Sequence, residues 1–253
     1  MPNSFKIAIV YNAFLNENEQ EAKEVMDALK EYDNTVVLAK ADTDFITTIQ
    51  KENFSLVLNL ARKFKDKNIG MSIASICELF ETNLIGANTY AFSITNDKDI
   101  LFKILKHDDV PVLQSLDPKM IKDIIEIYII KNTNFYMFFN KPLSIKLSEK
   151  LVERIKLLCQ KSFDSIHCSD YCKFQLYIDP DEKMFVTAIN PMPILTKRNN
   201  FFKSISLQGI DYTSFINLLV LTAAERYGLE LSEKYKQLKT TIGSKIGLHH
   251  KKI

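Results

Sequence analysis

The segment FVTAINPMP, from Phe185 to Pro193, is the most informative part of this sequence. Its apolar residues read as a β-strand that ends at the pair Asn190-Pro191. A second strand-like run, 171–178, precedes it, and the turn-forming residues of 179–183 lie between the two runs. The sequence therefore predicts an antiparallel hairpin here.

The N-terminal part of the chain, about ninety residues, alternates strand-like apolar runs with amphipathic helical ones. This alternation is typical of a parallel sheet with crossover helices. The expected strands are 7–11, 35–39, 56–60 and 84–86, and the expected helices are 17–31, 43–52 and 69–81. Because the turn at 12–16 contains no glycine, it lacks the fingerprint with which dinucleotide-binding folds approach a pyrophosphate.

The rest of the chain mixes helices and strands in another order. A helix is expected at 96–107, before Val110-Pro111, and a strand at 124–129 is continued by the aromatic run 135–139. Ser148 can cap a helix that runs to Cys159, and 211–227 reads as a closing helix.

Several segments, taken in chain order, resemble motifs of one enzyme family. They are 56–61 (similar to FNLAEG), 76–80 with 84–88 (similar to ELLGIPYTGS), 95–106 (similar to SLDKALTKKLL), 110–111 (similar to IPTP) and 188–191 (similar to Glu-x-Asn-Pro). On these motifs the chain resembles the ATP-grasp ligases of the D-alanine–D-alanine ligase type.

The resemblance implies an α/β fold built from two domains. Residues 1–92 would form a Rossmann-like pre-ATP-grasp domain, and residues 93–253 a truncated α+β ATP-grasp domain. Within the second, 93–116 would be a connecting helix and strand, and 117–253 a remnant with the hairpin and the closing helix. Only about a dozen residues separate Pro111 from Ile124, where the family has a phosphate-binding lysine and a glycine-serine loop. We therefore expect most of the nucleotide-gripping lobe to be absent.

The resemblance also marks a magnesium site whose ligands have changed. Gln175 and Ala188 stand where the family has two acids, and Asn190 alone is retained. A methyl group cannot ligate Mg²⁺, which needs oxygen donors in near-octahedral geometry. Lys173 replaces an arginine that in the family helps to hold the reacting oxyanion. The expectation is no metal, no cofactor and no assignable catalytic residue.

The first functional hypothesis is a family member that works by binding and lacks ligase activity. An amino acid or peptide would be held near Asn190, because cations and hydroxyl groups hold carboxylates without a nucleotide. The candidate ligand-binding residues are Lys173, Asn190, Thr196, Lys197 and Arg198. A homodimer, or a partner protein such as an active ligase, is the other expected mode. The run 135–139 reads mainly as β core, but loss of the covering lobe would leave apolar sheet exposed for such a partner.

The alternative is an active ligase that joins a carboxylate to an amine, with ATP and Mg²⁺ as cofactors. Its rebuilt nucleotide site would use Lys131, Lys141 or Lys146 for phosphate, and Asn190 with an acidic neighbour for Mg²⁺. Stabilisation by nucleotide would favour this alternative.

Composition is that of an ordinary globular protein, with 46% hydrophobic and 25% charged residues. The net charge of +2 gives no case for nucleic acid. We expect a cytoplasmic protein without a membrane span, since the sequence has no long apolar run and no signal layout. Four cysteines do not suggest a disulfide framework. The acids around the hairpin, Asp170 among them, read as solvated surface.

Overall fold

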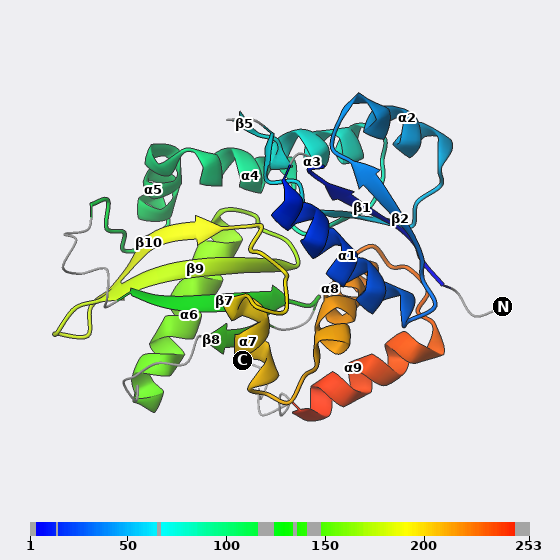
Figure 1. The fold of residues 1–253 in the computed structure, drawn as a ribbon. Helices are drawn as coiled ribbons and strands as arrows, with labels where there is room; N and C mark the ends of the chain where they lie inside the picture. Colours follow the sequence, from blue (N-terminus) through cyan, green and yellow to red (C-terminus); the bar gives the residue numbers. More distant parts are fainter. Residues whose placement is uncertain are drawn as a thin grey trace.

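The computed structural model describes residues 4–13, 15–64, 67–115, 124–133, 136–140 and 148–245. These residues form two four-stranded sheets surrounded by helices (Figure 1). The first sheet has the strand order β2-β1-β3-β6, and the second has the order β10-β9-β7-β8. A short pair, β4 (Lys63–Phe64) and β5 (Lys67–Asn68), lies apart from both. The α/β class expected from the sequence is confirmed.

Every strand pair of the first sheet is parallel, as predicted. Its elements are β1 (Lys6–Tyr11), α1 (Asn16–Lys30), β2 (Thr35–Lys40), α2 (Thr43–Lys51), β3 (Leu56–Asn59), α3 (Gly70–Leu79) and β6 (Leu84–Ile85). Alternate residues of β1 enter two different core clusters. Ile7 and Ile9 pack with the apolar face of α1, whereas Ala8 and Val10 pack with α2 and α3. Helices therefore cover both faces of this sheet.

The connection between the sheets contains two helices where the sequence predicted one. Asn88 caps α4 (Thr89–Asn96), and Asp97 then caps α5 (Lys98–His107) by accepting from two backbone N–H groups. Because the cap at Asp97 is extended, it separates the two helices. The predicted domain boundary after residue 92 falls within α4, and it stays a prediction. After α5, Val112 forms a single bridge to Val186 at the edge of the second sheet.

The second sheet is antiparallel throughout. Its strands are β7 (Ile124–Lys131), β8 (Tyr136–Asn140), β9 (Tyr171–Ile178) and β10 (Met184–Asn190), and the hairpin β9–β10 is the predicted one. The expected absence of a nucleotide-gripping lobe still rests on the length of chain before Ile124.

Helices also cover both faces of the second sheet. On one face lies α6 (Glu149–Ser165), which Ser148 caps as predicted, although the helix runs six residues beyond Cys159. On the other face lie α7 (Asn200–Ser206) and α8 (Tyr212–Arg226), and the ring of Tyr128 stacks on Phe201 with centroids 4.7 Å apart. The C-terminal helix α9 (Glu233–Lys245) packs on α8, as Figure 1 shows. None of the described helices combines the length and apolarity needed to cross a membrane.

The expectation of exposed apolar sheet is wrong for the described residues. No large apolar side chain of β7, β8, β9 or β10 is exposed, and Met137 and Phe139 of the aromatic run are buried. The helices on both faces, together with the register of the strands, leave no open apolar face in this part of the chain. For the described residues 136–139, the interpretation of the aromatic run as β core is confirmed, and Phe135 lies outside the described residues.

Asp170 is not part of a solvated acidic surface, contrary to the prediction. Its carboxylate is fully buried and accepts hydrogen bonds from Arg226 Nε at 2.7 Å and Nη2 at 2.8 Å. The N–H of Gly86, at the end of β6, donates to the same carboxylate at 2.7 Å. One ion pair therefore joins α8, the start of β9 and the first sheet.

Candidate functional site

The positions that the resemblance marks for magnesium lie side by side on one face of the second sheet. Ala188 is opposite Gln175 across the β10–β9 pair, and Gln175 is opposite Glu126 across the β9–β7 pair. In the next row, Asn190 is opposite Lys173. Directly opposed residues of antiparallel strands carry their side chains on the same face. The structure therefore brings together four predicted site residues and adds one acid, Glu126.

These residues do not fit a magnesium ion. Gln175 offers a neutral amide and Ala188 a methyl group, and the Oδ1 atom of Asn190 accepts from the N–H of Met192 at 2.9 Å. Mg²⁺ demands several well-placed oxygen ligands, usually with one or two carboxylates. Within the described part of the chain, no group of three or more acidic, histidine or cysteine residues is placed to hold a metal.

Glu126, the acid nearest to these positions, is already paired. Lys173 Nζ lies 3.2 Å from Glu126 Oε1, while Tyr128 Oη and Asn200 Nδ2 lie 3.0 and 3.1 Å from Oε2. Burial acts to raise the pKa of the Glu126 carboxyl, but the bonds from Asn200 and Lys173 outweigh it and hold that pKa below its ordinary value. The negative charge is therefore balanced by a lysine, which leaves little charge for a divalent cation.

One arginine of the segment that follows β3 binds the loop that follows β10. Arg62 donates from Nε to the carbonyl of Met192 and from Nη2 to that of Pro193, both at 3.2 Å. Its guanidinium also forms a two-pronged ion pair with the buried Glu21 of α1, at 2.5 and 2.7 Å. Glu21 in turn accepts from the N–H of Leu195 at 2.7 Å. The loop therefore has a fixed position relative to α1.

The predicted cations after this loop do not join the sheet face. The N–H of Lys197 donates to Glu24 of α1 at 3.0 Å, and its ammonium lies over the ring of Tyr212, 5.2 Å from the centroid. Arg198 is exposed and Thr196 is half-buried. Among the contacts of the described residues, none of the three side chains bonds to a residue of β7, β9 or β10.

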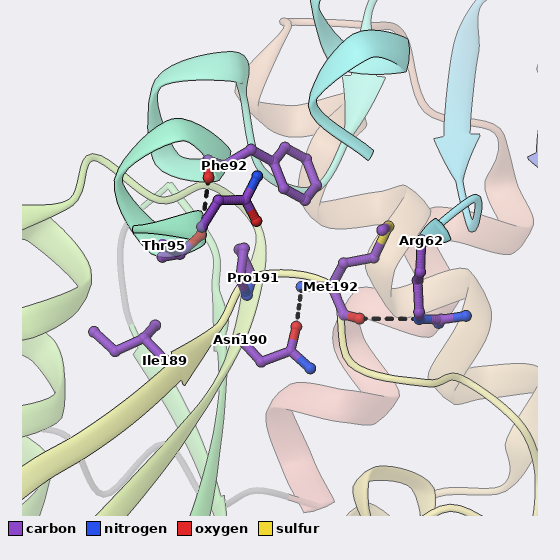
Figure 2. Close-up of a pocket in the computed structure, with 8 residues that line it drawn as sticks. Arg62, Phe92, Thr95, Ile189, Asn190, Pro191 and Met192 are labelled. Carbon is purple, nitrogen blue, oxygen red and sulfur yellow. Dashed lines mark hydrogen bonds between the residues drawn. The ribbon is translucent and has the colours of Figure 1, made fainter. Parts of the chain in front are cut away.

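A small cavity lies at the end of β10 (Figure 2). It has a volume of about 200 Å³ and is lined by Arg62, Phe92, Thr95, Asn96, Ile189, Asn190, Pro191 and Met192. Figure 2 shows the Asn190 amide turned toward the backbone of Met192, with Arg62 on the far side of that residue. Asn190 lines this cavity and also belongs to the row that contains Lys173, so it links the two places.

Lys131, proposed above as a phosphate ligand, lies on the opposite face of the sheet. Its ammonium pairs with Asp164 of α6 at 2.9 Å and lies over the rings of Tyr136 and Phe163. Successive residues of a strand point to opposite faces, so Lys131 cannot share a face with Glu126. The other two candidates, Lys141 and Lys146, lie outside the described residues.

Four residues of this region were missed in the sequence: Glu126, Asn200, Arg62 and Glu21. The sequence does single out Glu126, because it is the one charged residue in the apolar run 124–130. Arg62 is also visible in the sequence, because it directly follows the largely apolar run 56–61. Asn200 and Glu21 acquire their contacts only from the packing of α7 and α1.

A family model described as "D-ala D-ala ligase C-terminus" matches residues 93–221. A D-alanine–D-alanine ligase of Wigglesworthia glossinidia brevipalpis is 30% identical over 103 residues, which cover 41% of this chain and 28% of that protein. D-alanine–D-alanine ligase B of Clostridium perfringens is 23% identical over 159 residues, 56% of this chain and 53% of the relative. The chain thus spans about half or less of these curated relatives.

Solved structures share the fold. The D-alanine–D-alanine ligase of Bacillus anthracis, complexed with ATP, aligns with a TM-score of 0.69 at 14% identity, covering 87% of this chain and 97% of that one. The Coxiella burnetii ligase aligns with a TM-score of 0.67 at 14% identity, covering 95% and 97%. At this identity the likeness concerns the fold alone.

Proposed function

Because the chain belongs to the D-alanine–D-alanine ligase family of ATP-grasp carboxylate–amine ligases, we propose that it is a member that binds a small amino acid or peptide without ligating it. The observation that carries this proposal is the chemistry of one row of the second sheet. Ala188, Gln175 and Glu126 lie side by side there, and the only carboxylate among them is paired with Lys173.

ATP-grasp ligation would require a different charge distribution. Phosphoryl transfer depends on Mg²⁺ and cations that neutralise the charge developing on phosphate oxygens. In this row the only carboxylate, that of Glu126, is already paired with Lys173, and Lys131 faces the other side of the sheet. These residues support the proposal of a family member without ligase activity.

The size of the cavity beside Asn190 favours a small ligand. Pockets that enclose drug-sized molecules have volumes of roughly 300–1,000 Å³, whereas this cavity measures about 200 Å³. That volume suits an amino acid or a short peptide end better than a nucleotide. The ligand would meet Asn190 in the cavity wall and Lys173, which lies opposite Asn190 in the same row.

The test is thermal denaturation and calorimetry with ATP plus Mg²⁺, with ADP, and with D-alanine or D-alanyl-D-alanine. We expect no nucleotide response and a saturable response to the amino acid or dipeptide, reduced in Asn190→Ala but not in the exposed control Asn16→Ala. A magnesium-dependent complex with ATP would contradict the proposal and favour the active ligase with a rebuilt nucleotide site.

The expectation of a homodimer or a partner protein stays a prediction. The described residues have no exposed apolar sheet to support it. Sedimentation at several protein concentrations tests self-association directly. A monomer over the whole range would remove the homodimer and leave the small-ligand proposal unaffected.

A further inference from the structure

Three donors from three elements converge on the carboxylate of Glu126. They are the Lys173 ammonium of β9, the Tyr128 hydroxyl of β7 and the Asn200 amide at the start of α7, at 3.2, 3.0 and 3.1 Å. A cation together with two neutral donors is what a protein uses to recognise a carboxylate. The arrangement has the chemistry of a carboxylate-binding site that the chain occupies with its own side chain.

The accessibility of this pair differs from that of a purely structural ion pair. The Glu126 and Lys173 side chains are 18% and 21% exposed, whereas the Asp170 carboxylate is 0% exposed. Glu126 can therefore leave its donors for water without being stranded in the core, which is the main cost of breaking a buried pair. Asn190 lies opposite Lys173 and also lines the cavity at the end of β10, so it connects the Glu126–Lys173 pair to that cavity.

We propose that Lys173, Tyr128 and Asn200 form a carboxylate-binding site, that Glu126 fills it in the free protein, and that the carboxylate of an amino acid or of a peptide C-terminus replaces it. This inference rests on the proposed function and names the group that the ligand presents. Glu126 is then an internal competitor, and no metal or nucleotide takes part.

Glu126 also determines which carboxylates the site accepts. After rotating away from Lys173, its negative charge remains close to the bound ligand and repels a simple acid. An amino acid carries an ammonium group beside its carboxylate, and that group can pair with the displaced Glu126. The intact protein should therefore prefer a zwitterion such as D-alanine to acetate.

Chemical rescue tests the proposal. In Glu126→Ala the three donors lose their acceptor, so acetate should raise the melting temperature of this variant more than the same concentration of chloride does. Wild-type protein should respond equally to the two salts, and so should the control Glu233→Ala, whose side chain is 77% exposed. Adding Lys173→Met to Glu126→Ala should abolish the acetate effect.

A second measurement covers the case in which Glu126→Ala does not fold. Glu126→Gln keeps the shape of the side chain and removes the competing charge. It should bind acetate roughly tenfold more tightly than wild type, which corresponds to about 1.4 kcal/mol of competition removed, and it should lose the preference for D-alanine.

Two results would overturn the inference: equal effects of acetate and chloride on Glu126→Ala, or unchanged acetate binding in Glu126→Gln. Neither bears on nucleotide binding. A magnesium–ATP complex in the wild type would instead contradict the proposed function, so the two failures are distinguishable.

Discussion

Ala188 lies directly opposite Gln175 in the β9–β10 hairpin because a β-bulge intervenes after Val186. Val186 is opposite Leu176, so regular pairing would place Thr187 opposite Gln175 and turn Ala188 to the other face. The extra residue restores the alignment of the two positions. Their side chains share a face with Glu126 and form one uninterrupted row.

This row predicts the outcome of reverting Gln175→Asp and Ala188→Glu together. The two new carboxylates would adjoin Glu126, and like charges directly opposed across strands cost up to about 1 kcal/mol each. We expect a loss of about 1–2 kcal/mol in the free energy of unfolding without divalent cations, part of which Mg²⁺ restores, and no ATP hydrolysis. Urea denaturation and a phosphate-release assay check this against the neutral double variant Gln175→Asn, Ala188→Gln. ATP hydrolysis by the revertant would contradict it.

The local elements of this fold could be read from the sequence, since they depend on short-range patterns. The hairpin 171–190, the cap at Ser148 and the closing helix, which the structure begins after Asp211, all follow from residues close together in the chain. The start of the helix expected at residue 96 is wrong. Asp97 ends one helix and caps the next, which begins at Lys98. The sequence pattern predicts no helix over residues 89–95, where the structure has α4.

The candidate site could be located but not described from sequence. Alignment marked Gln175, Ala188 and Asn190, and those positions do lie together. The pairing of Lys173 with Glu126 joins residues 47 positions apart, and it depends on β7 lying next to β9. Long-range contacts of this kind follow from strand order, which no local pattern encodes.

Glu126 should make the stability of the protein depend on pH in the acid range. Its pKa in the folded state is lowered, so it contributes stability above its unfolded pKa of about 4.3, and that contribution disappears as the pH falls through the lower folded value. The difference in unfolding free energy between wild type and Glu126→Gln should be constant near neutral pH and shrink below about pH 4.3. Urea denaturation across this range measures it, with Glu233→Gln as the exposed control. A difference that grows toward acid pH would refute the assignment.

Asp170 should be one of the most costly polar residues to alter. Asp170→Asn removes the charge that balances Arg226 and weakens the acceptor of the Gly86 N–H. Breaking a buried pair by removing one partner costs about 3–5 kcal/mol. The matched change Asp33→Asn, in an exposed pair with Lys234, should cost under about 1 kcal/mol. Denaturant titration measures the loss in unfolding free energy for both variants. Similar losses would mean that the contacts of Asp170 with Arg226 and Gly86 do not hold α8, β9 and the first sheet together.

Glu21 should control the order of the loop after β10 more than it controls the sheet itself. Glu21→Gln replaces a buried carboxylate that holds Arg62 through two bonds and also accepts from Leu195. A neutral amide can accept at only one end, so Arg62 loses its charge partner and its hold on Met192 weakens.

The expected result is faster hydrogen exchange at the Leu195 amide, with exchange in the β9–β10 hairpin unchanged. Asp27→Asn, an exposed change on the same helix, is the control and should alter neither. Arg62→Lys should resemble Glu21→Gln, because an ammonium cannot reproduce the planar, two-pronged pairing of a guanidinium. If Leu195 exchanged at the wild-type rate in Glu21→Gln, the loop would be ordered by its other contacts, and the Glu21–Arg62 pair would serve only to join α1 to the segment that follows β3.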